Sequence, residues 1–459
     1  MENSVKANRG DFSQGSVSGA ILRLAVPMTL AQLVNVLYSL ISKIYLGRLP
    51  GAAHLALSGV GVTLPVIYII MSVSALCGSG GGPLFAIARG KGDDEEAERI
   101  MGNAFTMLLF SGVALTALVL IFRRPLLFLF GASGDTYDFA SEYLMIYSLG
   151  SIFVMITLGM NVFINAQGFG RTAMLTVVIG ASVNLVLEPI FIFALGMGVR
   201  GAALSTVIAQ FCSAMWVLRF LTGKKTILRL KRSRMKLLAK RVRKILTLGL
   251  AGFTMTLTTS LSQIISNVML QRHGGDMYIG VMAAINALRE VVIMPIFGME
   301  RGSSPVISFN YGAEKFERVR RAIRFKVSMT VSYAVVAWAV VMLFPGALIR
   351  IFNSDPELIA IGIPALRVYF GLFIFMSFQL ASQGVFLGLG RAKNAIFFAL
   401  LRKAFIVAPL TLILPTIGMG TLGVFIAEPI SQFIGGLASF GTMYFIVYRK
   451  LLLKKEINQ

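Results

Sequence analysis

Long runs without a charged residue dominate this chain, and the longest extends from Leu55 to Ala88. About 20 apolar residues suffice for a helix to cross the hydrocarbon core of a membrane, where a helix satisfies its own backbone hydrogen bonds. Only 14% of the 459 residues are charged and 56% are apolar, against about 25% charged in a typical soluble domain. The sequence therefore predicts an all-α, multi-pass membrane protein and excludes a disordered chain, a disulfide scaffold and an ordinary soluble enzyme.

Twelve segments of this kind are predicted to be membrane-spanning helices. Because the number is even, the two ends of the chain are expected on the same side of the membrane. Lys and Arg gather on the cytoplasmic side, and the segment 219–244 alone contains 12 of them. We therefore expect both termini and the other basic segments, including 315–326, in the cytoplasm. The predicted spans are 22–46, 54–83, 98–122, 139–165, 172–195, 201–221, 245–270, 277–308, 322–344, 361–387, 394–415 and 420–447.

The two halves of the chain repeat one another. Gly-Phe-Gly-Arg at 168–171 matches Gly-Leu-Gly-Arg at 388–391, and the glycine-rich segment 196–201 matches 418–423, which gives offsets of 220 and 222 residues. Six spans in each half give both halves the same orientation, so an axis along the membrane normal relates them. This pattern favours a transporter with its substrate path between two six-helix bundles over a channel.

The repeat also defines the expected domains. Residues 1–222 form an N-terminal six-helix bundle, residues 223–243 a basic cytoplasmic linker, and residues 244–459 a C-terminal six-helix bundle. A net charge of +23 would favour nucleic acid as a partner of a soluble protein. Here it follows the membrane topology, so we expect a solvated, lipid-facing linker and no nucleic-acid partner. Since no hydrolase, kinase or phosphate-loop motif is present, no enzyme and no cofactor are predicted.

Glu188 is the only acidic residue deep in a predicted span of the first half. A charge inside the membrane is costly and indicates a functional site by default. Asn184 lies four positions earlier, on the same helix face, and Pro189 removes the usual hydrogen bond to the Leu185 carbonyl. A carboxylate, an amide oxygen and a carbonyl on one face suit a small hard cation or a proton. The alternative is a structural carboxylate that binds neighbouring hydroxyl groups.

The predicted spans of the second half carry more charge. Glu290 and Arg301 share one helix but lie about 16 Å apart, because each residue adds about 1.5 Å, so their partners must come from other helices. We expect at least one carboxylate to pair with Arg402 or Lys403, since an unpaired charge at this depth is costly. Structural ion pairing and direct substrate binding are both open for this charge network. Its members are Arg289, Glu290, Glu300, Arg301, Arg402, Lys403 and Glu428.

Several motifs at their present spacing are similar to those of a known family. The chain resembles the MATE (multidrug and toxin extrusion) transporters from about residue 15 to 448, and most closely their bacterial DinF-like and MepA-like branch. The motifs are Leu24-Ala-Val-Pro27, Gly90-Lys-Gly-Asp93, Asn161-Val-Phe-Ile-Asn-Ala-Gln-Gly168, Asn184-Leu-Val-Leu-Glu-Pro189, Gly198-Val-Arg-Gly-Ala-Ala203 and Pro305-Val-Ile-Ser-Phe-Asn-Tyr-Gly-Ala313.

The resemblance implies a fold, an activity and a site. It implies two bundles that form a cleft, and an antiporter of the bacterial cytoplasmic (inner) membrane that exports cationic, amphipathic compounds in exchange for Na+ or H+. We expect a monomer whose partners are a small-molecule substrate and membrane lipid. By motif, the coupling site would comprise Ser42, Asn184, Glu188 and Thr206, and Na+ could bind at the last three. The family usually has Asp where this chain has Ser42, and commonly Asp where it has Glu188, so one site carboxylate is missing.

One other function remains open from the sequence, and a third is disfavoured. A flippase or exporter of a lipid-linked or anionic metabolite, from the same wider superfamily, would use the intramembrane cations of the second half. A receptor or scaffold that does not transport is disfavoured, because nothing in the chain resembles a soluble sensory or docking domain.

Overall fold

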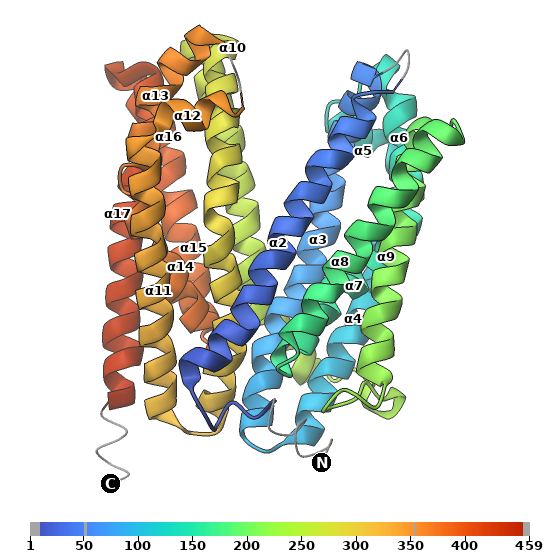
Figure 1. Cartoon of the computed structure of the whole chain (residues 1–459), viewed down its shortest axis with the longest axis vertical. Helices are drawn as coiled ribbons and strands as arrows, with labels where there is room; N and C mark the ends of the chain where they lie inside the picture. Colours follow the sequence, from blue (N-terminus) through green and yellow to red (C-terminus); the bar gives the residue numbers. More distant parts are fainter. Residues whose placement is uncertain (1–9, 50–52, 353–354, 453–459) are drawn as a thin grey trace. The chain divides into compact units, whose positions relative to one another are not determined.

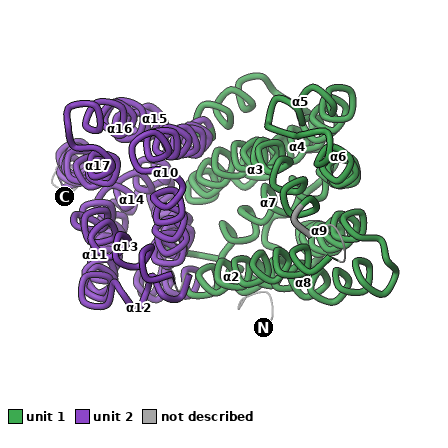
Figure 2. The backbone as a smooth tube through the Cα atoms, turned by 90° about the horizontal axis from the view of Figure 1, so that it is seen from above, with its two compact units in different colours: residues 1–12, 26–249 green, residues 13–25, 250–459 purple. Residues whose placement is uncertain are grey.

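The computed structural model describes residues 10–49, 53–352 and 355–452 of the chain, and these residues are nearly all helical, with no strand among them. Contacts divide the chain into two compact units: residues 1–12 with 26–249, and residues 13–25 with 250–459 (Figure 2). The predicted cytoplasmic ends of the chain, 1–9 and 453–459, lie outside the described residues.

The first unit is a helical bundle. Helix α4 begins after Asp93, whose carboxylate accepts a hydrogen bond from the Glu96 backbone N–H at 2.9 Å, as a good N-cap does. Helices α6 and α7 meet at Gly150 with a bend of 54°. The helices, visible in blue to green in Figure 1, are α2 (Val17–Leu46, whose first nine residues cluster with the second unit), α3 (Ala53–Gly90), α4 (Asp94–Ile121), α5 (Arg123–Leu129), α6 (Gly134–Leu149), α7 (Ser151–Ala166), α8 (Gly170–Pro189) with a π-helical turn Ile190–Ala194, and α9 (Gly198–Thr222).

The second unit is a second helical bundle. Its longest helix, α10, is interrupted at Gly275, which has a φ of 72° that only glycine adopts at low cost. Helices α13 and α14 form a pair bent by 45°. The helices are α10 (Ala239–Gly312), α11 (Phe316–Leu343), α12 (Pro345–Arg350), α13 (Pro356–Phe370), α14 (Phe373–Gly388), α15 (Ala392–Leu400), α16 (Ala408–Leu414) and α17 (Gly420–Thr442), with π-helical segments at Leu401–Val407, Pro415–Met419 and Met443–Tyr448.

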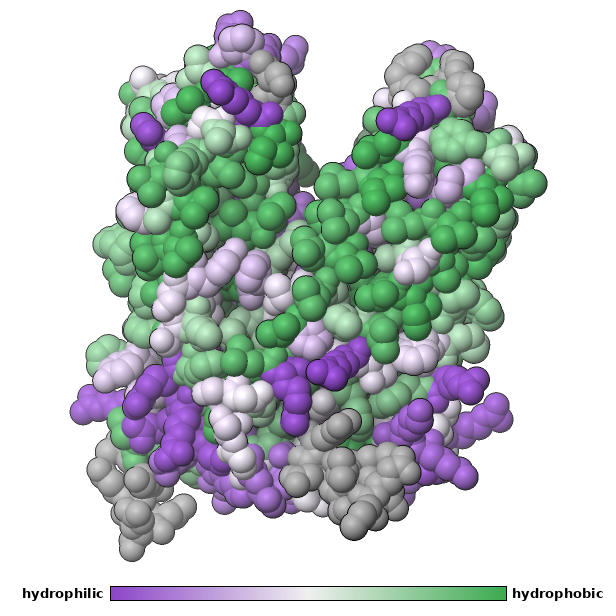
Figure 3. Space-filling model, viewed as in Figure 1, coloured by the Kyte–Doolittle hydropathy of each residue, from purple (hydrophilic) through white to green (hydrophobic). Residues whose placement is uncertain are grey.

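The described helices account for twelve membrane spans. Eight helical stretches are long and apolar enough to cross a membrane, and the two bent pairs bring the number to ten. Two of the eight are double length: the 74-residue α10 breaks at Gly275, and the 61-residue stretch Ala392–Leu452 breaks at Gly418 and Gly420. The prediction of a twelve-helix, all-α membrane fold is confirmed, and apolar side chains cover the middle length of the helices on the face shown in Figure 3.

The repeat is more regular in the structure than in the sequence. Helices α4, α6, α7, α8 and α9 begin at residues 94, 134, 151, 170 and 198, and α11, α13, α14, α15 and α17 begin at 316, 356, 373, 392 and 420, each 222 residues later. Positive φ angles follow the same offset, since Gly168, Gly196 and Gly198 correspond to Gly390, Gly418 and Gly420. The shared residues are therefore those that end one helix and start the next.

The basic segment predicted as a solvated linker, 223–243, packs on the first unit, while most of its residues stay exposed. The Asn103 side chain accepts a hydrogen bond from the Leu238 backbone N–H at 3.0 Å, and Lys231 pairs with Glu98 at 2.8 Å. The acidic first turns of α4 attract the lysines and arginines of the segment. The boundary between the units accordingly lies at Gly249 rather than at residue 243.

A short N-terminal stretch also departs from the predicted domains. Residues 13–25 were assigned to the first bundle but cluster with the second unit. Arg318 donates hydrogen bonds to the backbone carbonyls of Gln14 and Gly15 at 2.9 and 3.0 Å, and Lys315 donates to that of Ser13 at 3.2 Å. These cations at the start of α11 hold the stretch before α2.

Candidate functional site

Glu188 lies one residue from the end of α8 and is 0% exposed. The Ser42 hydroxyl of α2 donates a hydrogen bond to Glu188 Oε1 at 2.5 Å. In the part of the chain that the structure describes, no lysine or arginine forms an ion pair with this carboxylate. The site therefore contains a buried acidic group that only neutral hydrogen-bonding groups contact.

Asn184 connects Glu188 to helix α9. One orientation of its side-chain amide satisfies all the neighbouring groups. In it, the amide nitrogen donates to Glu188 Oε2 at 2.6 Å, and the amide oxygen accepts from the hydroxyl and backbone N–H of Thr206 at 3.1 and 3.2 Å. The structure thus brings together all four predicted residues of the coupling site.

The end of α8 has the irregular backbone expected at Pro189. A π-helical turn, Ile190–Ala194, follows directly, and such turns are frequent at functional sites. That the Leu185 carbonyl is free to bind an ion stays a prediction.

Three tyrosines that sequence analysis missed surround this site. The Tyr38 and Tyr143 side chains lie near the Thr206 hydroxyl, and both interact electrostatically with Glu188. Tyr147 stacks on Tyr143 with ring centroids 6.0 Å apart. The four-residue spacing of Tyr143 and Tyr147 on one helix face was the available signal, but buried aromatic residues are common in any helical core.

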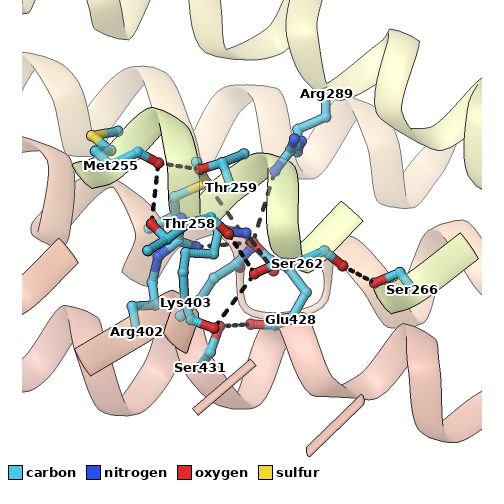
Figure 4. Close-up of polar contacts among 12 residues, drawn as sticks. Met255, Thr258, Thr259, Ser262, Ser266, Arg289, Arg402, Lys403, Glu428 and Ser431 are labelled. Atoms are coloured by element: carbon cyan, nitrogen blue, oxygen red, sulfur yellow. Dashed lines mark hydrogen bonds and ion pairs between the residues drawn. The ribbon is translucent and has the colours of Figure 1, made fainter. Parts of the chain in front are cut away.

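Glu428 in α17 is the centre of the second unit's charge cluster (Figure 4). Its carboxylate binds Arg402 Nη1 at 2.9 Å and Lys403 Nζ at 2.9 Å, and Arg289 Nη1 lies 3.9 Å away. Arg402, Lys403 and Glu428 are each 4% exposed. The expected pairing of a carboxylate with Arg402 or Lys403 is therefore present.

The local backbone explains how two consecutive residues reach one carboxylate. Arg402 and Lys403 lie in the π-helical segment Leu401–Val407, and a π turn is wider than an α turn. The stem of Arg402 also packs over Gly435 of α17, where a β-carbon would lie only 3.2 Å from Arg402 Cγ. The glycine lets the two helices approach closely.

The predicted charge network is not one network. Glu300 does not join the Glu428 cluster but pairs with Lys326 of α11 at 2.5 Å. Lys326 was predicted to lie in a cytoplasmic segment, yet it is 1% exposed, because α11 already begins at Phe316 and places it about 15 Å along the helix. Glu290 and Arg301 are exposed and lie outside the Glu428 cluster.

Comparison with known proteins places the chain among transporters. A family model described as MatE matches residues 27–190 and 251–413. The multidrug export protein MepA of Staphylococcus haemolyticus is 24% identical over 430 residues, covering 92% of this chain and 93% of that protein. MepA of Staphylococcus aureus is 23% identical over 441 residues, with 95% of each chain covered.

Solved structures share the fold over almost the full length. A multidrug resistance MATE family transporter of the MOP superfamily, solved in an outward-facing conformation, matches with a TM-score of 0.87 and 25% identity, over 93% of this chain and 95% of that one. A MOP superfamily transporter from Pyrococcus furiosus, described as having a binding pocket of reverse polarity that suggests a different function, matches with a TM-score of 0.87 and 25% identity, over 94% and 95%.

Proposed function

The chain belongs to the MatE family of membrane transporters and is not an enzyme, and from this premise we propose that it exports cationic, amphipathic drugs or metabolites from the cell in exchange for H+ or Na+. The export of small molecules agrees with the MepA relatives, which are multidrug export proteins. We further propose that it does so as a monomer in the cytoplasmic membrane of a bacterium, with both termini in the cytoplasm and membrane lipid around it.

The observation that carries the coupling proposal is the isolation of Glu188. A buried carboxylate without a cationic partner is costly in its ionised form. The cost falls when a cation binds to it, so the residue favours the uptake of H+ or a metal ion. A carboxylate with a purely structural role would be stabilised more by a permanent basic partner, as Glu428 is by Lys403.

The hydrogen bonds around Glu188 favour H+ as the coupling ion. An ionised Glu188 accepts the amide N–H of Asn184 and the hydroxyl of Ser42, so only neutral donors stabilise its charge. Uptake of a proton removes that buried charge, and a protonated Glu188 would donate to the Asn184 amide oxygen once the amide turns over.

Na+ is the competing coupling ion. Na+ prefers oxygen ligands, and oxygens of Asn184, Glu188 and Thr206 could supply them at this site. Ser42 contributes a neutral hydroxyl where the resemblance to the family implies a second carboxylate, which reduces the negative charge that would attract Na+.

A second candidate function is the export of an anionic or lipid-linked metabolite. The observation in its favour is the excess of cations around Glu428, where three basic side chains face one buried carboxylate. The Pyrococcus furiosus relative was also described as differing in pocket polarity and function.

Reconstitution in liposomes tests the proposal. Uptake of ethidium or norfloxacin would be followed under an imposed pH gradient and, separately, under a Na+ gradient. We expect the pH gradient to drive accumulation of the cationic compounds. If only the Na+ gradient drives accumulation, the coupling ion is Na+ and not H+. If neither gradient drives accumulation of the cationic compounds, the second candidate function is favoured.

A further inference from the structure

A small polar cavity lies inside the second unit, beside the Glu428 cluster. Its volume is about 30 Å³, and one water molecule needs roughly 10–15 Å³ of such space. The cavity can therefore hold one small ion or about two to three water molecules, but no nucleotide or sugar phosphate. Its polar lining includes Ser262, Asn286, Arg289, Lys403, Thr411 and Glu428.

The charges around this cavity do not balance. Arg289, Arg402 and Lys403 surround Glu428, whose carboxylate is the buried acidic group of the cluster. Glu290 interacts electrostatically with Arg289 but is exposed, and even when it is counted the basic groups outnumber the acidic ones. Uncompensated charge that is buried is unfavourable, so the cluster favours an additional negative charge nearby.

A hydrogen-bond donor in the cavity lining is also left without a partner. Thr411 is 1% exposed and lines the cavity, and its hydroxyl has no partner among the described residues. Arg402 Nε, which belongs to the Glu428 cluster but not to the cavity lining, is also buried and without a partner among them. Buried polar groups in this state require an explanation such as a bound ion.

The geometry points to a binding site for one small monovalent anion, of about the size of chloride, in this cavity. The anion balances the excess positive charge of Arg289, Arg402 and Lys403, and it accepts a hydrogen bond from the Thr411 hydroxyl. A metal cation is disfavoured, since the cavity lining contains two basic side chains, Arg289 and Lys403, and a single carboxylate. This site concerns the second unit alone and does not depend on the proposed transport activity.

Equilibrium binding to the purified full-length protein tests the site without any transport measurement. Radioactive chloride would be titrated against the protein in gluconate buffer, and bromide and acetate would be used as competitors. We expect saturable binding of one anion per chain and stronger competition by bromide than by acetate. Absence of saturable binding to the wild-type protein would overturn the proposal, and stronger competition by acetate would overturn the assignment to a halide-sized ion.

Two matched variants locate the binding. Thr411→Val removes the hydroxyl from the cavity and should weaken chloride binding roughly tenfold, as expected for a hydrogen bond to a charged group. Thr330→Val makes the same change at another buried hydroxyl without a described partner, outside the cavity lining, and should leave binding unchanged. Equal affinity of both variants for chloride would contradict the assigned position.

Discussion

Thr206 and Glu428 occupy equivalent positions in the two repeats, 222 residues apart, each eight residues after the first residue of its helix, α9 or α17. Thr206 bonds to the neutral amide of Asn184, whereas Glu428 binds three basic side chains. One backbone arrangement thus supports an acidic site without cations in the first unit and a cationic cluster in the second. We expect the two positions to respond differently to the same kind of substitution.

Removal of the Glu428 charge should destabilise the second unit. Glu428→Gln leaves buried basic groups without their carboxylate, at a cost of about 3–5 kcal/mol, and we expect a clearly lower thermal unfolding temperature in detergent. The double variant Lys403→Met with Glu428→Gln should recover part of the loss, because it removes one of the orphaned charges.

Glu290→Gln is the matched control for this experiment. It makes the same change in the same unit at an exposed carboxylate, and exposed pairs contribute about 0–1 kcal/mol. An unfolding temperature that falls as much for Glu290→Gln as for Glu428→Gln would show that the cluster has no special structural role.

Gly384 of α14 is expected to be essential for the Glu300–Lys326 pair. A β-carbon at this position would overlap the Glu300 carboxylate, so Gly384→Ala must displace Glu300 from buried Lys326. Gly441→Ala, on α17, adds the same methyl group where nothing lies within 4 Å and should be neutral or slightly stabilising, since Ala favours a helix. We expect a lower thermal unfolding temperature for Gly384→Ala than for Gly441→Ala. Equal unfolding temperatures of the two variants would contradict the close packing at Gly384.

Ser42 is expected to determine how strongly transport depends on the ion. Ser42→Asp places a second carboxylate beside Glu188, to which the Ser42 hydroxyl now donates at 2.5 Å. Two adjacent carboxylates require a cation between them, so transport should respond more steeply to pH or Na+ than in the wild type. Ser42→Ala, which removes the hydrogen bond without adding charge, should not increase that response. Identical ion responses of Ser42→Asp and wild type would count against this site geometry.

The fold was largely predictable from the sequence, because uncharged runs and the distribution of Lys and Arg follow from the solvent properties of a bilayer. Glu188 and Asn184 were predictable as a candidate site for the same reason, since Glu188 is conspicuous in an apolar helix, whereas Ser42 and Thr206 were indicated only by the resemblance to the MATE transporters. The position of segment 223–243 was not, because its basic residues are equally compatible with water, lipid headgroups or the acidic start of α4. Lys326 was assigned to a cytoplasmic segment on the basis of its residue type. Its burial is decided instead by its position relative to the start of α11.

The aromatic residues around Glu188 show another limit. Tyr38, Tyr143 and Tyr147 come from two helices, and only the folded bundle brings them to one place. The sequence showed that the predicted spans of the second half carry more charged residues than those of the first. It did not show that Glu300 lies apart from the Glu428 cluster, because that depends on which helices pack together.

Substrate-induced proton release tests most directly whether Glu188 couples transport to H+. Purified protein in weakly buffered detergent solution would be mixed with saturating ethidium while the pH is recorded, for wild type, Glu188→Gln and the control Glu142→Gln, whose carboxylate pairs with exposed Arg200. Because linkage makes substrate and proton binding reciprocal, wild type and Glu142→Gln should release about one proton per bound substrate, and Glu188→Gln should bind ethidium without releasing a proton. Equal proton release from Glu188→Gln and wild type, or none from wild type with ethidium bound, would contradict the account.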